Sequence, residues 1–142
     1  MKILKLQHCP GLVPSEGSLC IAESNSDSVP FDIKRVYYSY GVEADIVRGR
    51  HAHKTLEQIL ICVYGEIEVG MDNGKGEIDN IILKDPSEGL YVGPSIWHTM
   101  KWIKSDSVLL VLASNHYDAN DYIREYDEFI ELVSKENQRS GQ

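Results

Sequence analysis

The stretch VRGRHAHKTLEQILICVYGEIEV, residues 47–69, decides the fold of this chain and points to its chemistry. It places His51 and His53 one residue apart and continues through Glu57 into an apolar run. Alternate residues of a strand point to the same face, so in an extended segment both imidazoles project together. Two histidines on one strand face, followed by a carboxylate and later by His98, predict a functional site.

Short strand patterns separated by turns extend on both sides of this stretch. We expect further strands at residues 3–7, 18–23, 33–40, 77–83, 90–92 and 108–113. The connecting segments are rich in glycine, proline and asparagine, as in the hairpin loop at residues 71–76. Many short strands without intervening helices predict an antiparallel sandwich or barrel, an all-β fold.

The hydrophobic period changes only near the C-terminus. Apolar residues there follow helical spacing with acidic residues between them, at Tyr122, Ile123, Tyr126, Phe129, Ile130 and Val133. Asp118 is a suitable N-cap for such a helix. We therefore expect one C-terminal helix at about residues 119–135 with a polar tail after it, in a single domain that spans residues 1–142.

Composition excludes several classes of function. The chain has 142 residues, 42% of them hydrophobic, and a formal net charge of −8, so a nucleic-acid partner is not expected. Neither a signal peptide nor a membrane-spanning run is expected, because no apolar segment is long enough. The three cysteines are odd in number and widely spaced, which predicts no disulfide framework and a cytoplasmic location.

The histidines allow two kinds of chemistry. His51, His53, Glu57 and His98 together form a set of imidazole and carboxylate ligands that suits iron, manganese, nickel or zinc. The same histidines can instead act as acids and bases, because an unperturbed imidazole exchanges protons near neutral pH. From the residue types alone both hypotheses stay open.

Four blocks of sequence are similar to a known family. HxHxxxE followed by a glycine, a hairpin and PSIWH is the two-motif pattern of the cupins, which are jelly-roll double-sheet barrels. FDIKRVYY, RGRHAHKTLEQILICVYG, GLYVGPSIWH and VLASNHYDANDYIREYDEF resemble the cupin 3,4-ketoisomerases that act on dTDP-4-keto-6-deoxyglucose. Residues 48–51, RGRH, also resemble a segment of the dTDP-sugar 3,5-epimerases.

This resemblance implies an isomerase of deoxysugar biosynthesis. It would act without metal or cofactor on a dTDP-linked keto sugar, in the synthesis of a 3-amino-3,6-dideoxy sugar for lipopolysaccharide or S-layer glycan. The resemblance also implies a homodimer with exchanged N-terminal strands. A metal-dependent cupin enzyme and a non-catalytic cupin that binds a sugar nucleotide are the alternatives.

The same resemblance implies roles for individual residues. His51 would be the base at carbon 3, and His53 would shuttle the proton or stabilise the enediolate. Tyr37 would hydrogen-bond the sugar oxygens. Arg48, and after it Arg35, would hold the diphosphate, because the arginine fork matches phosphate oxygens. A further substrate contact is expected from His98. Tyr91 and Trp97 would either stack on the thymine or pack in the core.

Two departures from the family pattern affect the expected nucleotide contacts. Pro14-Ser15-Glu16-Gly17 stands where the family commonly has Asp-x-Arg-Gly, so Glu16 replaces an arginine. Ser95 replaces the usual glycine of the second motif. Neither departure involves the paired histidines, and neither predicts whether the product has gluco or galacto configuration at carbon 4.

Overall fold

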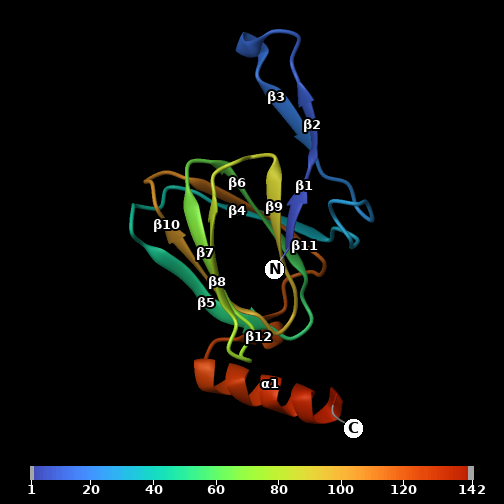
Figure 1. Ribbon diagram of the computed structural model, residues 1–142, viewed down its shortest axis with the longest axis vertical. Helices are drawn as coiled ribbons and strands as arrows, with labels where there is room; N and C mark the ends of the chain where they lie inside the picture. The colour runs from blue at the N-terminus through green and yellow to red at the C-terminus, as the bar shows by residue number, and fades with distance from the viewer. Residues whose placement is uncertain (1, 141–142) are drawn as a thin grey trace.

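Two five-stranded antiparallel sheets face each other in the computed structural model, which describes residues 2–140 (Figure 1). The first sheet has the spatial order β1 (Lys2–Lys5), β9 (Glu88–Val92), β6 (Gln58–Tyr64), β11 (Val108–Ala113) and β4 (Arg35–Ser39). The second has the order β12 (Tyr122–Ile123), β5 (Val47–His53), β10 (Trp97–Trp102), β7 (Ile67–Asp72) and β8 (Ile78–Leu83). The predicted all-β jelly-roll barrel is confirmed.

The main core lies between the two sheets and follows from strict alternation along the strands. In β7, Ile67, Val69 and Met71 are buried, while the residues between them are only half-buried. From β11, Leu109 and Val111 join the same apolar cluster. Because the side-chain period of a strand is two, this pattern fixes which face of each strand looks into the barrel. His98 and His53 are buried on those inward faces.

A second apolar cluster covers the outer face of the first sheet. Ile59 and Ile61 of β6 point outward and pack against Val29 and Phe31 from the segment that precedes β4. Residues on the two faces of β6 therefore have different neighbours. Even-numbered residues such as Gln58 and Leu60 face the barrel interior, and odd-numbered ones face this outer layer.

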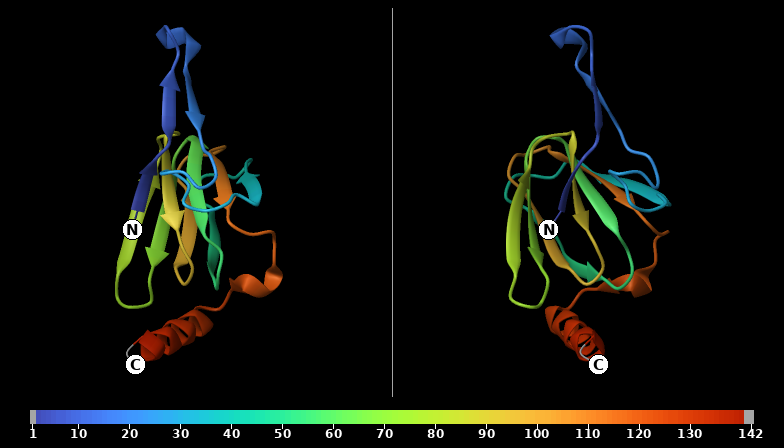
Figure 2. Two further views of the ribbon diagram at one scale, coloured as in Figure 1. Left: turned by 90° about the vertical axis from the view of Figure 1, so that its right-hand side faces the viewer. Right: turned by 45° about the vertical axis from the view of Figure 1, so that its right-hand side comes forward.

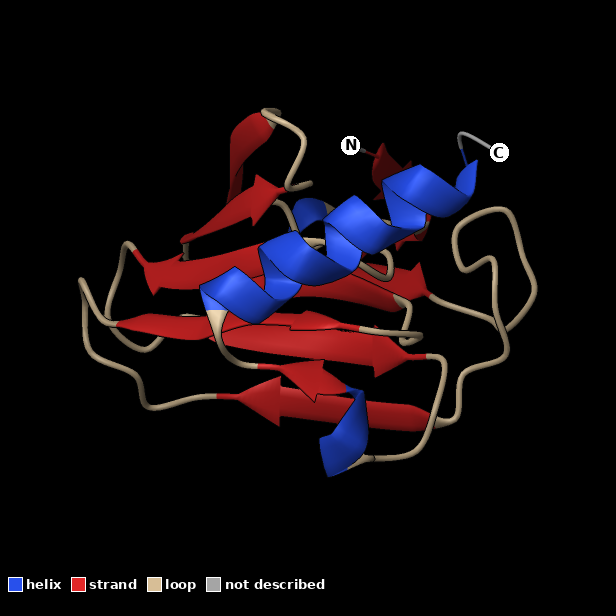
Figure 3. Cartoon of the chain, turned by 90° about the horizontal axis from the view of Figure 1, so that it is seen from below, coloured by secondary structure: helices blue, strands red, loops and turns tan. Residues whose placement is uncertain are grey.

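The C-terminal helix α1 (Tyr126–Ser140) lies across one end of the barrel (Figures 1 and 3). Its buried residues Phe129 and Val133 pack with Ala52 of β5 and Ile123 of β12. The predicted helix start at about residue 119 is wrong. Residues 119–121 form a 3-10 turn, which Asp118 caps by accepting from the Asn120 N–H, and the next two residues pair with β5 as β12. The helix also continues to residue 140, beyond its predicted end.

The N-terminal hairpin projects away from the barrel (Figure 2). It consists of β2 (Gln7–Pro10) and β3 (Ser18–Ile21), with a 3-10 turn, η1 (Pro14–Glu16), near its tip. Its apolar residues Leu12 and Leu19 are 96% and 62% exposed. Within residues 2–140, no helix is long and apolar enough to cross a membrane.

Candidate active site

A bulge in β5 sets the position of the first histidine. His98 of β10 lies opposite His51, but its neighbour Thr99 lies opposite Gly49, so Arg50 is an extra residue in β5. Gly49 and Arg50 both have positive φ, 88° and 57°. A Cβ atom at Gly49 would lie 3.1 Å from the His98 carbonyl oxygen, so the close strand approach requires glycine there.

Three histidines from two neighbouring strands form one cluster inside the barrel. The ring centroid of His51 lies 4.9 Å from that of His53 and 4.8 Å from that of His98. One nitrogen from each ring lies within 4.8 Å of those of the other two. The Tyr122 ring of β12 packs on the cluster, 4.5 Å from His53 and 5.1 Å from His51. The structure thus brings together the histidines that the sequence placed 47 residues apart.

The imidazoles are neutral at neutral pH. Burial, and after it the charge of a protonated His51, lower the pKa of His98 to about 3 and that of His53 to about 4. Burial also lowers the pKa of His51, the most exposed of the three, and the positive charge of Arg124 acts in the same direction. Neutral imidazoles carry a free lone pair, so the cluster is able to accept protons.

Both buried histidines have an acceptor next to Nδ1. The Nδ1 of His98 lies 3.0 Å from the carbonyl oxygen of Ile96. The Nδ1 of His53 lies 3.3 Å from Oδ2 of Asp121, an ion-pair distance, although the alignment is not that of a regular hydrogen bond. Asp121 was not predicted as a site residue, because residues 119–123 were expected to be helical.

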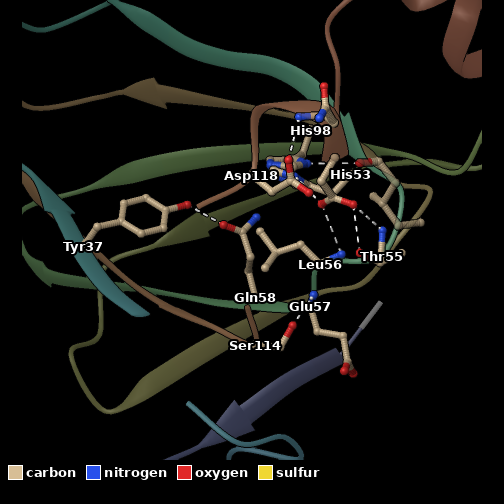
Figure 4. A network of polar contacts seen from close by, with 12 residues as sticks. Tyr37, His53, Thr55, Leu56, Glu57, Gln58, His98, Ser114 and Asp118 are labelled. Atoms are coloured by element: carbon tan, nitrogen blue, oxygen red, sulfur yellow. Dashed lines mark hydrogen bonds and ion pairs between the residues drawn. The ribbon is translucent and has the colours of Figure 1, made fainter. Parts of the chain in front are cut away.

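On the opposite sheet, β4 directs Tyr37 and Arg35 toward the same interior. The Tyr37 hydroxyl donates a hydrogen bond to Gln58 Oε1 (Figure 4), and burial raises the pKa of Tyr37 to about 12. The Arg35 guanidinium lies 5.1 Å from the Tyr37 ring centroid and 5.7 Å from that of Tyr117. Within residues 2–140, its buried Nε has no hydrogen-bond partner. Arg35 is therefore held in place with donor capacity to spare.

Two further arginines flank the cluster. Arg48 is exposed, and the bulge pairs it with Met100, whose side chain packs on the interior core. Cross-strand partners share a face of the sheet, so the side chain of Arg48 leaves the backbone on the inner face of β5. Arg124, which the sequence analysis missed, stacks on the Tyr122 ring at 4.5 Å and acts electrostatically on His51. The pairing of β12 with β5 brings it there.

The carboxylate of the proposed metal set is not at the cluster. Glu57 points away from the histidines (Figure 4), and its Oε1 accepts a 2.6 Å hydrogen bond from the Tyr91 hydroxyl. Gln58, with the opposite parity, occupies the inward position instead. The three histidines suit a borderline metal ion. The set of three histidines and Glu57 does not fit, and the alternative hypothesis is corrected on this point.

Two predicted substrate contacts lie on outer faces. Trp97 is adjacent to His98 in β10 and so points the other way, where it packs against Tyr126 and Phe129 of α1. Tyr91 packs on the outer cluster of the first sheet together with Ile59. The structure does not bring either ring to the histidines, because strand parity places both outside the barrel.

Comparisons with known proteins show the family of the chain. A model of the family described as FdtA: WxcM-like, C-terminal, matches residues 1–134. The chain is 48% identical over 126 residues to the TDP-4-oxo-6-deoxy-alpha-D-glucose-3,4-oxoisomerase of Aneurinibacillus thermoaerophilus, and the match covers 89% of each chain.

Two solved structures are similar in fold and sequence. A histidine-to-asparagine mutant of the 3,4-ketoisomerase QdtA from Thermoanaerobacterium thermosaccharolyticum, in complex with TDP-4-keto-6-deoxyglucose, matches with a TM-score of 0.86 and 42% identity over 94% of each chain. The TDP-quinovose 3,4-ketoisomerase WlaRB from Campylobacter jejuni matches with a TM-score of 0.84 and 45% identity, over 92% of this chain and 96% of that one. With its histidine cluster inside a cupin barrel, the chain belongs to the FdtA family of sugar 3,4-ketoisomerases.

Proposed function

We propose that this enzyme moves the keto group of TDP-4-keto-6-deoxyglucose from carbon 4 to carbon 3. The observation that carries the proposal is the cluster of His51, His53 and His98, three neutral imidazoles that meet inside the barrel. The similarity to isomerases of this substrate class supports the choice of sugar nucleotide.

His51 is the proposed base at carbon 3. The ketone at carbon 4 acidifies the hydrogen on carbon 3, so a neutral imidazole can remove that proton and leave an enediolate. Return of a proton to carbon 4, with loss of the proton on oxygen 3, gives the 3-keto sugar without any net oxidation. His51 suits this role because it is the most accessible of the three imidazoles and stays unprotonated at neutral pH.

His53 and Tyr37 are proposed to assist the oxygens. The enediolate has its negative charge on oxygen, and positioned donors stabilise such charge by several kcal/mol. The Tyr37 hydroxyl donates to Gln58 Oε1 and would exchange that acceptor for a sugar oxygen, and its raised pKa keeps it protonated. His53 would carry a proton between the two oxygens, and His98 would pack the cluster and face the sugar.

The diphosphate is assigned to arginines at the edge of the interior. Arg35 is held between Tyr37 and Tyr117, and Arg48 starts from the inner face of β5. Because these arginines would bind a part of the substrate that does not react, Arg48→Ala should raise KM more than it lowers kcat. An effect confined to kcat would remove Arg48 from the diphosphate site.

The direct test is incubation with TDP-4-keto-6-deoxyglucose in deuterium oxide, followed by NMR of the sugar. Signals of the 3-keto isomer are expected, and where carbon 4 keeps protium its coupling to the carbon 5 proton shows the stereochemistry there. Deuterium at carbon 4 would show exchange between the base and solvent, whereas full retention of protium would show direct transfer by one base. Unchanged substrate would refute the proposal and leave a binding protein as the alternative.

We also propose that the protein is a homodimer in the cytoplasm. The projecting hairpin exposes Leu12 and Leu19, and an exchange of N-terminal strands between two copies would cover such residues. Light scattering should give twice the chain mass of 16.0 kDa, and a mass of one chain at micromolar concentration would contradict the dimer. The cysteines Cys9, Cys20 and Cys62 are free, which fits a reducing compartment.

A further inference from the structure

Asp121 has a carboxylate that the protein holds in place from three directions. Its Oδ1 accepts hydrogen bonds from both the backbone N–H and the hydroxyl of Thr55, each at 2.8 Å. Its Oδ2 accepts from the Leu56 N–H at 3.3 Å, and Thr55 and Leu56 lie beside His53 in the polar network (Figure 4). The Lys54 N–H also donates to the Asp121 carbonyl oxygen at 3.0 Å. The position of this carboxylate therefore does not depend on the histidine.

The same carboxylate is next to one nitrogen of His53. Oδ2 of Asp121 lies 3.3 Å from His53 Nδ1, and the two side chains are 12% and 2% exposed. An ionised carboxylate only accepts hydrogen bonds, so a neutral His53 is favoured with its proton on Nδ1. The other tautomer would place the Nδ1 lone pair against a carboxylate oxygen in a poorly solvated site.

The remaining nitrogen of His53 is left without a partner. In the described part of the chain, both nitrogens of His53 are buried without a regular hydrogen bond, and Nδ1 is the one that has a carboxylate oxygen near it. The other groups around the ring are His51, His98, Tyr122 and, across the barrel, Arg35. Among residues 2–140, Asp121 is the carboxylate that lies within ion-pair distance of the cluster. Of these neighbours, Asp121 has the charged acceptor that would favour a proton on Nδ1 of His53.

We propose that Asp121 is a positioning residue that holds His53 with its proton on Nδ1 and an unprotonated Nε2. This rests on the proposed isomerase function and deepens it. With that tautomer, Nε2 of His53 accepts the proton that leaves oxygen 3 and then gives it to oxygen 4. One O–H bond breaks and one forms, while the proton on carbon moves separately through His51, so the step balances without a co-reactant. The opposite tautomer has its lone pair on Nδ1, so its protonated Nε2 cannot accept the proton that starts this transfer.

The first experiment measures the tautomer directly in the wild-type protein. Long-range ¹H–¹⁵N correlation spectra at neutral pH distinguish a protonated Nδ1 from a protonated Nε2, and His53→Asn identifies which signals belong to His53. We expect a protonated Nδ1. A protonated Nε2 in the wild-type protein would overturn the proposal, whether or not the enzyme turns over the keto sugar, so its failure is distinguishable from failure of the proposed function.

The second experiment compares Asp121→Asn with Asp118→Asn. The first change keeps an oxygen that can accept from Thr55, but it can present an amide donor to His53 Nδ1 and reverse the tautomer. The second removes the same charge from the same segment at a position where Asp118 accepts from Asn120 N–H, and asparagine caps as well as aspartate.

For Asp121→Asn we expect a loss in kcat of about 10²- to 10⁴-fold, the upper figure being the loss that a wrong histidine tautomer causes in serine proteases. KM should change less than about threefold, and the His53 proton should move to Nε2. For Asp118→Asn both the spectrum and kcat should match the wild-type protein. An Asp121→Asn enzyme with wild-type kcat, or one that loses activity with His53 still protonated on Nδ1, would overturn the positioning role.

Discussion

Replacement of His51 by asparagine tests the proposed mechanism most directly. The change removes the group assigned to the carbon 3 proton. A general base contributes about 10²- to 10⁴-fold to a rate, which corresponds to about 2.7–5.4 kcal/mol of transition-state stabilisation. We therefore expect kcat to fall by at least that factor of about 10², because neither His53 nor His98 is as accessible as His51.

The structure also says what His51→Asn should leave intact. His51 is only half-buried, and its ring contacts side chains rather than filling the main apolar core, so the free energy of unfolding should fall by about 1 kcal/mol or less. The affinity for TDP should stay within about twofold. Once protonated at low pH, His51 lowers the pKa of His53 and His98, so its replacement should raise both pKa values.

The assay is NMR of the keto sugar over time, with calorimetry of TDP binding and urea denaturation of the same samples. His53→Asn is the matched comparison, and it should reduce kcat less if His53 only assists. A kcat for His51→Asn within about threefold of the wild-type value, with binding and stability unchanged, would refute the assignment of the base. If kcat falls further in His53→Asn than in His51→Asn, then His53 is the base at carbon 3 and His51 assists.

Four other changes test the site from different directions. Gly49→Ala should lower the free energy of unfolding by about 1–3 kcal/mol in urea and reduce kcat, because φ is 88° and the new Cβ would lie 3.1 Å from the His98 carbonyl oxygen. Tyr37→Phe should lower the free energy of unfolding in urea by about 1–3 kcal/mol, because it leaves Gln58 Oε1 buried without a donor. An unchanged denaturation midpoint would contradict this expectation. Dialysis against a chelator should leave turnover unchanged, and recovery of a chelated, inactive enzyme on adding one divalent ion would overturn the metal-free mechanism. The contribution of the buried histidines to stability should be complete above pH 6.5, the ordinary histidine pKa, and should decrease as the pH falls toward the lowered pKa values of about 4 for His53 and about 3 for His98. The reason is that the unfolded chain binds protons that the folded cluster excludes. Thermal melts from pH 7 to 4 that show no such decrease would contradict the burial of these rings.

The strands were predictable because their information is local. Alternation in β7 predicts a strand with one buried face, and the continuous apolar run of β11 predicts a strand in the middle of a sheet. The structure confirms both. The HAH segment also placed two imidazoles on one face without any knowledge of the rest of the fold.

The C-terminal segment was predicted less well for a physical reason. Tyr122 and Ile123 fit a helical period as well as a strand, and the N-cap preference of Asp118 is the same for a 3-10 turn and for an α-helix. Pairing with β5 makes these residues a strand rather than a helix, and the local sequence pattern does not reveal a partner strand that lies about 70 residues away. Asp121 and Arg124 were missed for this reason, since both reach the histidines through that pairing.

The sequence by itself therefore determined the all-β architecture, the paired histidines and the resemblance to an isomerase family, because period, turn chemistry and motif spacing are properties of short segments. Only the tertiary structure decided which residues share the cavity. A bulge at Arg50 turned Arg48 inward, and strand parity turned Glu57 and Trp97 outward. One residue more or less in a strand reverses the face of every side chain beyond it, and that register is fixed by pairing between distant strands.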